Sequence, residues 1–192
     1  PPPPPLVNGS FETPVGLNDG VSAALGSPWA PVPDPLPGMV WVATWNPPLS
    51  EYNLVDFPDG DNVCYVFFDV PAPGSAFGAS QVLTETFAAN TNYMVTVKVG
   101  RSNTYDWPGF RVVLLAGGTV LASDEDPSTT APTAGNFINS TVSYTYDAGD
   151  VGLVGQSLEI RLLSRGVIVD GAGANGWEVD FDDVSFTATP AP

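Results

Sequence analysis

The sequence predicts an all-β protein built as a single antiparallel β-sandwich. The chain has 192 residues with 21 prolines and 20 glycines, and its longest stretch without either is residues 79–99. That stretch is rich in Thr and Val, which favour strands over helices. Short apolar segments follow one another between turn residues at even spacing, which is typical of sandwiches. No internal repeat or polar linker divides the chain, so we expect one domain with one core.

Ten segments are predicted as strands because each combines alternating apolar residues with flanking Gly, Pro, Asn or Asp. In chain order they are residues 6–12, 39–45, 62–70, 80–87, 93–99, 110–115, 119–123, 137–146, 158–163 and 177–187. The segments 18–37 and 123–135 are rich in Pro, Gly, Ser and Asp. We expect both to be surface loops.

Two local features refine this assignment. The pair Gly117–Gly118 separates two apolar segments, which predicts a hairpin because both central positions of such a turn favour positive φ. Cys64 is the sole cysteine of the chain and lies in an apolar segment. It is therefore predicted to pack in the core rather than to form a disulfide.

The charge balance narrows the choice of partners. Five Lys and Arg residues oppose 21 Asp and Glu residues, and the formal net charge is −16. Such a charge repels nucleic acid and anionic lipid, so we expect neither partner. No apolar run reaches the roughly 18 residues of a membrane-spanning helix. A surface rich in Thr, Ser, Asn, Asp and Gly, with almost no lysine, favours an extracellular or cell-surface location.

The two ends of the chain are rich in proline. Residues 1–5 are all Pro and predict a stiff, extended N-terminal arm, while residues 189–192 form a similar C-terminal tail. The sandwich domain is then expected to span residues 6–188. Because a stiff arm can dock on a neighbouring subunit, the arm also suggests self-assembly into an extracellular filament, matrix or surface layer.

The stretch WEVDFDDVSF (residues 177–186) predicts a β-bulge. Its apolar residues stand at odd numbers up to Phe181 and at even numbers from Val184 onward. If both halves face the same core, the strand must absorb one extra residue at Asp182–Asp183. An acid that a bulge turns inward or edgewise requires a cation or a hydrogen-bond donor.

A calcium ion is one candidate for that partner. Asn8 and Glu12 lie near the start of the chain, and Asp182 and Asp183 lie near its end. If the first and last strands are neighbours, these oxygens form the all-oxygen shell that calcium prefers. The alternatives are edge-strand charges that discourage aggregation and an Asx turn at Asn8.

The same two segments carry a family resemblance. LVNGSFETP and GWEVDFDDVSFTATP resemble the two ends of galactose-binding-domain-like jelly rolls, which include calcium-containing carbohydrate-binding modules. The segments WNPPLSEYNLVDFPDGDNVCYVF, SQVLTETFAANTNYMVTVKVG and FRVVLLAGGTVLAS resemble exported bacterial proteins of this superfamily, including ones with a PEP-CTERM sorting tail. The resemblance implies a jelly-roll sandwich, and it implies that Glu12 and Asp182 are calcium ligands.

The residue types of the chain offer few candidates for catalytic groups. The chain contains no histidine, which removes the usual general base and the commonest zinc ligand. Glu85, Asp106 and Glu178 are nominal carboxylates for glycoside cleavage, but nothing in the sequence pairs one with another. They are interpreted as solvated surface acids, and the chain is predicted not to be an enzyme.

Glycan binding needs aromatic platforms beside polar groups, because a sugar stacks on a ring while its hydroxyls require partners. The loop GRSNTYDWPGF offers Arg101, Asn103, Tyr105, Asp106 and Trp107 within seven residues. We expect this loop to be the best local site for a glycan or polysaccharide.

A second platform is conceivable at Trp41 and Trp45, which share strand parity. Val40 and Val42 on the opposite face suggest burial on both sides, so core packing is favoured for this pair. The predicted function is a secreted, non-catalytic, calcium-stabilised module with a carbohydrate-binding or cell-surface role. The alternative is the structural subunit assembled through the proline-rich arm.

Overall fold

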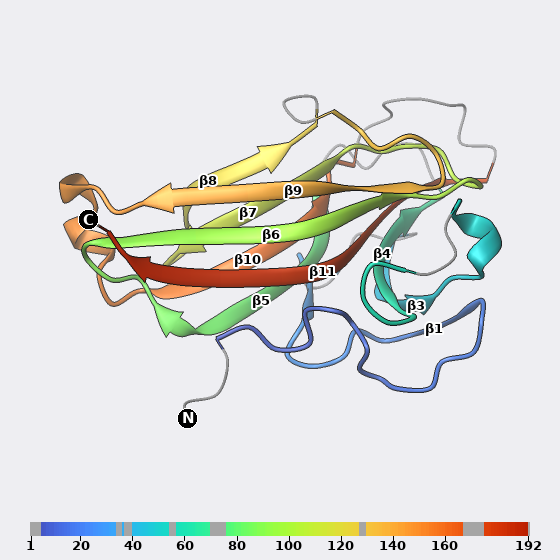
Figure 1. The fold of residues 1–192 in the computed structure, drawn as a ribbon, viewed down its shortest axis with the longest axis horizontal. Coiled ribbons are helices and arrows are strands. Elements are labelled where there is room, and N and C mark those ends of the chain that lie inside the picture. The colour runs from blue at the N-terminus through green and yellow to red at the C-terminus, as the bar shows by residue number, and fades with distance from the viewer. Residues whose placement is uncertain are drawn as a thin grey trace.

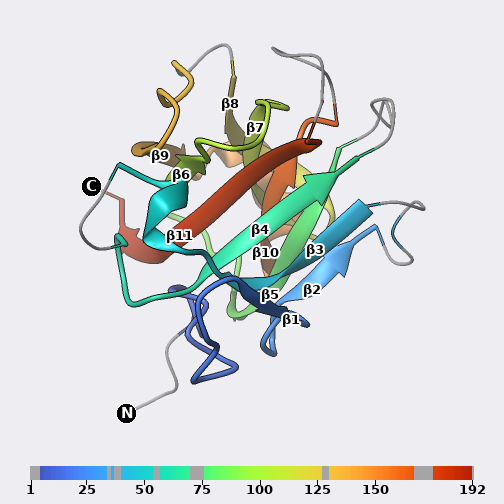
Figure 2. The same cartoon turned by 90° about the vertical axis from the view of Figure 1, so that its right-hand side faces the viewer.

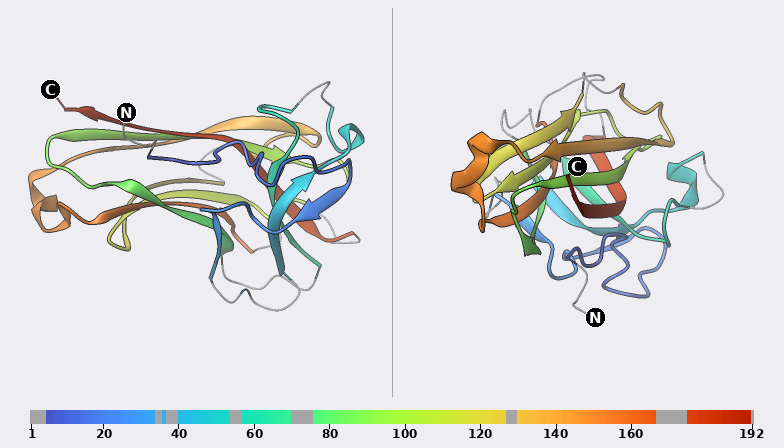
Figure 3. Two further views of the ribbon diagram at one scale, coloured as in Figure 1. Left: turned by 90° about the horizontal axis from the view of Figure 1, so that it is seen from below. Right: turned by 60° about the vertical axis from the view of Figure 1, so that its left-hand side comes forward.

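The computed structural model describes residues 5–33, 36, 40–53, 57–69, 76–126, 130–166 and 175–191. They form two antiparallel sheets that face each other (Figures 1 and 3), so the predicted sandwich is confirmed. The six-stranded sheet has the order β1 (Val21–Ala23), β3 (Val40–Asn46), β4 (Val63–Phe68), β11 (Trp177–Pro190), β6 (Thr91–Arg101) and β9 (Asn136–Thr145). The five-stranded sheet has the order β2 (Ala30–Val32), β5 (Phe77–Thr86), β10 (Ser157–Ser164), β7 (Phe110–Ala116) and β8 (Thr119–Glu125).

The main core lies between the two sheets because alternate residues of each long strand are apolar. In β11, Trp177, Val179 and Phe181 are at most 5% exposed. They belong to the same apolar cluster as Ile160 and Leu162 of β10. Burying a side chain of this size contributes about 1.5–3 kcal/mol relative to leaving it exposed. From Trp177 to Phe181, the odd-numbered residues of β11 therefore form the inner face, and the even-numbered residues between them point away from the core.

The predicted strand at residues 6–12 is wrong. This segment has no strand, and Asn8 and Phe11 have φ angles of 53° and 58°, which interrupt an extended backbone. Its backbone binds a side chain instead, because the amide of Gln81 pairs with both the N–H and the carbonyl of Val7 at 2.9 and 2.8 Å. The predicted loop at 18–37 is also wrong in part, since it contains the short edge strands β1 and β2.

The other nine predicted strands each overlap an observed strand. Their predicted ends differ from the observed ends by three residues or fewer. Their predicted ends at Met39 and Val70 lie outside the described residues, as do residues 1–4 of the predicted arm and Pro192. β11 continues to Pro190, beyond the predicted end of the domain. The Gly117–Gly118 hairpin is confirmed, with φ angles of 54° and 81° between β7 and β8. Cys64 is fully buried, as predicted.

The predicted bulge in β11 is also confirmed. The pairing of β11 with β6 shifts between Asp182 and Ser185, and Asp183 has a φ angle of 47°. Asp182 is fully buried, whereas Asp183 is exposed. The extra residue lets Val184 return to the core side, where it is 6% exposed. Over the described residues, no helix has the length and apolar character needed to cross a membrane.

A second, smaller apolar cluster lies on the outward face of the six-stranded sheet. It consists of Tyr52, Phe57 and Val63, with Trp45, Tyr65 and Phe137 packed against it. The short 3-10 helix η1 (Leu49–Glu51) lies over this end of the sheet, while η2 (Ala148–Leu153) lies at the other end of the sandwich (Figures 1 and 2). This cluster and η1 therefore cover outward-pointing residues of β11 at this end of the six-stranded sheet. Away from this end, the outward face of the sheet is exposed to solvent.

Candidate active site

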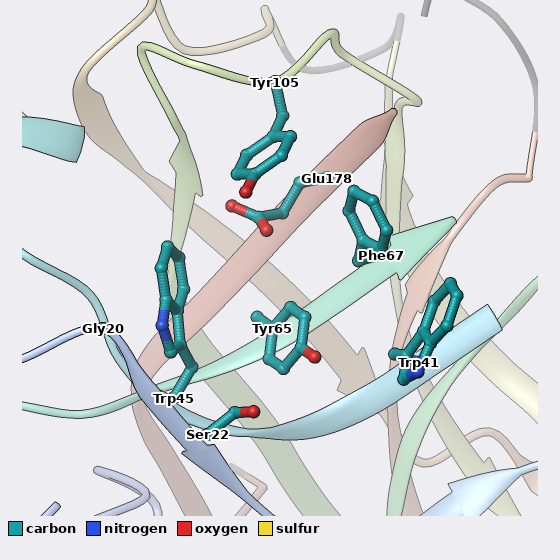
Figure 4. A pocket seen from close by; sticks show the side chains of 8 residues that line it. All are labelled: Gly20, Ser22, Trp41, Trp45, Tyr65, Phe67, Tyr105 and Glu178. Carbon is teal, nitrogen blue, oxygen red and sulfur yellow. The ribbon is translucent and has the colours of Figure 1, made fainter. Parts of the chain in front are cut away.

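A pocket of about 300 Å³ opens beside this second cluster. Its floor is the outward face of β3, β4 and β11, and one wall comes from the loop between β6 and β7 (Figure 4). The lining residues are Gly20, Ser22, Trp41, Trp45, Tyr65, Phe67, Tyr105 and Glu178. Five aromatic rings surround one carboxyl group, which is the composition of a site for a small, largely apolar molecule.

The aromatic walls follow from strand periodicity. Trp41 and Trp45 stand four residues apart on β3, and Tyr65 and Phe67 stand two apart on β4, so all four point to the same face. The centroids of Trp41 and Phe67 are 5.5 Å apart, and those of Trp45 and Tyr65 are 5.6 Å apart. Tyr105 meets Phe67 edge-on at 5.3 Å. Contacts of this kind hold the rings in place around the pocket.

The loop that carries Tyr105 is fixed at both ends. The backbone N–H of Glu178 donates to Asp106 O at 3.1 Å, and the N–H of Asp106 donates to Gly176 O at 3.1 Å. The hydroxyl of Ser102 donates to Glu51 at 2.7 Å. These bonds join the loop to the start of β11 and to η1. Tyr105 is thereby placed with its hydroxyl directed toward Glu178 (Figure 4).

Glu178 and Asp180 are the charged groups at the floor of the pocket. They are adjacent on the outward face of β11, and they are 2% and 0% exposed. The hydroxyl of Tyr52 donates a hydrogen bond to Asp180 Oδ2. Glu178 Oε1 and Asp180 Oδ1 are buried without a donor of their own. A proton shared between the two neighbouring carboxyls satisfies both, because two ionised carboxylates only accept hydrogen bonds.

The electrostatics of the pair place that proton on Glu178. Burial raises the pKa of Glu178 well above the usual range, and the charge of Asp180 and the hydrogen bond to it raise it further. Burial raises the pKa of Asp180 to about 7, although hydrogen bonds from Tyr52 and Glu178 oppose the rise. A hydrogen bond that favours ionised Asp180 favours neutral Glu178. The site thus presents a carboxylic acid, rather than a carboxylate, to an aromatic pocket at neutral pH.

The structure assigns only one residue of the predicted glycan loop to this pocket, which is Tyr105. Trp107 is 0% exposed and belongs to the main core, so its predicted role as a surface platform is wrong. Its indole N–H donates to Asp126 at 3.1 Å, and Arg101 lies over its ring at 6.0 Å. Asn103 is exposed and donates to Asn53 at 3.2 Å.

Two other predictions, for the pair Trp41 and Trp45 and for Glu178, are wrong. Trp41 is 41% exposed and lines the pocket with Trp45, so the core packing favoured for this pair is wrong. Glu178 is buried, so its interpretation as a solvated surface acid is wrong, whereas Glu85 is exposed as expected. Strand parity did point Glu178 away from the core. What strand parity does not reveal is that segments distant in sequence pack over this face and bury Glu178.

The predicted calcium ligands divide into two groups. Glu12 and Asp182 approach the same loop: Glu12 Oε1 accepts from the N–H groups of Asp61 and Asn62 at 2.9 and 2.8 Å, and Asp182 Oδ2 accepts from Asp59 N–H at 3.0 Å. Asn8 instead makes a local turn, with its side chain accepting from Thr13 N–H at 3.0 Å. This bond spans five residues, whereas an Asx turn joins a side chain to the backbone two residues on, so the Asx turn weighed as an alternative stays a prediction.

Asp183 points to the exposed side of the bulge, away from Asp182. Among the described residues, no group of three or more His, Cys, Asp or Glu side chains is arranged to hold a metal ion. The first and last segments do adjoin, because Gly9 O accepts from Val184 N–H at 2.9 Å. A Cβ atom at Gly9 would lie 2.3 Å from Val184 O, so only glycine fits there. A calcium ion near Glu12 and Asp182 stays a prediction.

Comparison with known proteins identifies the family. Residues 2–187 match the HpiC1-like family, described as HpiC1 cyclase, and the chain belongs to this family. It is similar to the Stig cyclase Fisc from Fischerella sp. TAU in complex with (3Z)-3-(1-methyl-2-pyrrolidinylidene)-3H-indole, with 29% identity, 98% coverage of both chains and a TM-score of 0.80. A cyclase from Fischerella sp. TAU in complex with 4-(1H-indol-3-yl)butan-2-one is 29% identical over 98% of both chains, with a TM-score of 0.79. No curated protein matches the chain.

The fold is also that of carbohydrate-binding modules, as the resemblance in the sequence implied. The xylan-binding CBM22-1 domain of Paenibacillus barcinonensis Xyn10C is 13% identical over 92% of this chain and all of that domain, with a TM-score of 0.50. This likeness concerns the fold alone. Membership in a cyclase family overturns the predicted non-catalytic carbohydrate-binding module and its filament-subunit alternative, and it overturns the prediction that the chain is not an enzyme. The extracellular location stays a prediction.

Proposed function

We propose that this protein is a cyclase that closes a ring in a small aromatic molecule by protonating it. The observation that carries this proposal is the buried acid at the pocket floor: Glu178 lies against Asp180 and opens into a space walled by aromatic rings. Family membership supplies the reaction class. The site supplies a proton donor and a cavity with aromatic walls, and acid-initiated cyclisation requires a donor positioned against its substrate.

The proposed reaction is an isomerisation. The proton of Glu178 adds to one carbon of a substrate double bond, and the adjacent carbon becomes a cation. A second π bond of the substrate attacks this cation and forms the new carbon–carbon bond. Loss of a proton from the attacking partner restores its unsaturation and returns a proton to the acid pair. One proton enters and one leaves, so the product has the mass of the substrate and no oxidant or reductant is consumed.

Each part of the pocket has a role in this scheme. Glu178 donates the proton, and Asp180 holds the neighbouring negative charge that Tyr52 stabilises through its hydrogen bond. A developing cation is attracted to the faces of Trp41 and Trp45, because the ring quadrupole presents negative charge there. Interactions that strengthen only as charge develops lower the barrier rather than merely binding the substrate.

An indole-bearing substrate suits the pocket. Two similar cyclases hold indole compounds, and the pocket of about 300 Å³ is at the small end of the range for ligand sites. Aromatic walls accept an indole by stacking or edge contact. Ser22 and Tyr105 add hydroxyls at the pocket edge that can fix its orientation.

The test is incubation with C3-alkenyl indoles in H₂O and in D₂O, followed by mass spectrometry and NMR. We expect a cyclic product with the mass of the substrate, and one carbon-bound deuterium when the solvent is D₂O. Glu178→Gln should lose on the order of a hundredfold or more in rate, the typical contribution of general acid catalysis. Glu85→Gln removes an exposed carboxylate and is the matched control. Failure of the whole series to cyclise, or full activity of Glu178→Gln, contradicts the proposal.

A further inference from the structure

We propose that the aromatic pocket above Glu178 and Asp180 is a recognition site for an organic cation, and that it binds an indole carrying a quaternary ammonium group more tightly than the neutral molecule of the same shape. This inference rests on the proposed function in one respect, since a ring-closing cation and a stable ammonium ion require the same surroundings. It goes further by naming a class of ligand that the site holds without reaction.

The first support is the arrangement of the walls. Trp41, Trp45, Tyr65, Phe67 and Tyr105 come from three separate segments and enclose one space (Figure 4). A cation within about 6 Å of a ring centroid is attracted by the ring, and Trp provides the strongest attraction. Several rings around one space are the arrangement by which proteins bind choline and methylated lysine. A neutral alkyl group gains the same apolar contact but not this electrostatic attraction.

The second support is the acid pair beneath the rings. Glu178 is 2% exposed, lines the pocket and has Oε1 without a hydrogen-bond donor. Asp180 behind it is fully buried, and its Oδ1 likewise lacks a donor. Buried acids are normally paired with a cation, because an unpaired buried charge is costly. Among the described residues, the hydrogen-bond partners of Asp180 are the phenol of Tyr52 and the neighbouring Glu178, and neither is a cation.

The third support is that none of the described residues lining the pocket is basic. The salt bridges identified among the described residues join Arg111 and Arg165 to Glu125, and Arg161 to Glu159. None of these residues lines the pocket. Glu51, which accepts from Ser102 near the pocket, adds a further negative group. A ligand cation thus meets acids and rings at the site and no repelling charge in its lining.

The charge of the whole chain favours the same class of ligand. A formal charge of −16 attracts any cation to the surface and repels anions. This general attraction does not discriminate between sites, so a test must separate it from recognition in the pocket. Two probes of equal shape and different charge, and two variants of equal net charge, provide that separation.

The probes are 2-(1H-indol-3-yl)-N,N,N-trimethylethanaminium and its carbon isostere, 3-(3,3-dimethylbutyl)-1H-indole. Titration calorimetry at physiological ionic strength should show the cation binding about tenfold tighter than the isostere, which corresponds to the strength of a desolvated cation–π site. At pH 8, where Asp180 carries the charge of the pair, Asp180→Asn should abolish most of the preference, whereas Glu85→Gln, which removes an exposed acid, should retain it. Trp41→Ala should weaken the cation more than the isostere, and circular dichroism would confirm that each variant is folded.

Several results would overturn the inference. They are equal affinities for the two probes, absence of binding by both, or a preference that survives both Asp180→Asn and Trp41→Ala. The outcome is independent of turnover. A protein that cyclises alkenyl indoles but shows no charge preference refutes this inference alone, and a protein that prefers the cation but cyclises nothing refutes the proposed function alone.

Discussion

The hydroxyl of Tyr52 donates a hydrogen bond to Asp180, which lies 128 residues further along the chain. Tyr52 is held between Phe57, edge-on at 5.4 Å, and Phe137, stacked at 4.8 Å. Its position therefore depends on the second apolar cluster rather than on the main core. Because Asp180 in turn neighbours Glu178, a packing contact outside the pocket controls the charge state of the acid inside it.

Tyr52→Phe keeps the ring and removes the donor. Since the Tyr52 hydrogen bond lowers the pKa of Asp180, we expect that pKa to rise above its value of about 7. The acid limb of the pH–rate profile, which reports the protonation of Asp180, should move to higher pH, and the free energy of unfolding should fall by about 1–3 kcal/mol. Infrared spectra of the buried carboxyl band across pH, alongside the pH–rate profile, check this. An unshifted profile would show that Tyr52 only fills space.

Stability should fall as pH rises. Burial raises the pKa of Asp180 to about 7 and that of Asp182 to about 8. Both lie above the roughly 3.9 of an aspartate in an unfolded chain. The folded state therefore binds more protons, and the free energy of unfolding should decrease between about pH 4 and pH 8.

Urea titrations in the presence of a chelator measure this dependence. Asp182→Asn should flatten the slope in the upper part of the window, near pH 8. Asp183→Asn, at an exposed position, should change the slope much less, because the charge of Asp183 is a smaller cause of the raised pKa of Asp182 than burial. A stability that is constant or rises across this window in the parent contradicts the burial of these acids.

Calcium should stabilise the protein if Glu12 and Asp182 share an ion. At one hundred times the dissociation constant, linkage gives about 2.7 kcal/mol, or about 5–10 °C of melting temperature for a chain of this size. Glu12→Gln should lose the response to added calcium. Because Glu12 also binds the N–H groups of Asp61 and Asn62, its baseline stability should fall as well, so the calcium response is the informative quantity. A parent whose melt is unaffected by calcium and chelator ends this prediction.

Trp107 and Trp41 provide a matched pair for stability. Trp107 is fully buried and donates to Asp126, so Trp107→Ala should cost about 3–5 kcal/mol. Trp41 is 41% exposed, and Trp41→Ala should cost far less. Chemical denaturation of both variants gives the comparison. Equal losses would mean that the pocket wall is as important to the sandwich as its core.

Alternation along the chain was sufficient to predict most strands and the bulge, because one face of each long strand is buried against the opposing sheet. It failed at residues 6–12, whose spacing imitates a strand but whose backbone is held by Gln81 and by Val184. It also failed at the short strands β1 and β2, whose sequences read as loop. Short edge strands depend on their neighbours more than on their own residues.

The site was harder to predict than the fold. Glu178 was correctly assigned to the outward face, but outward does not mean exposed where η1 and the loop around Tyr105 cover the sheet. Within that loop, no pattern in the sequence separates Tyr105, which lines the pocket, from Trp107, which enters the core. Such distinctions arise from contacts between segments that are tens of residues apart, and periodicity carries no information about them.

The second apolar cluster has an evolutionary consequence. Tyr52, Phe57 and Val63 pack over the sheet as a group separate from the main core. Substitutions at the pocket wall and in the segments over it can accumulate with little effect on the packing between the sheets. The residues around the pocket can thus change during evolution while the sandwich stays intact. Related proteins with this fold can therefore come to act on different molecules and form different products.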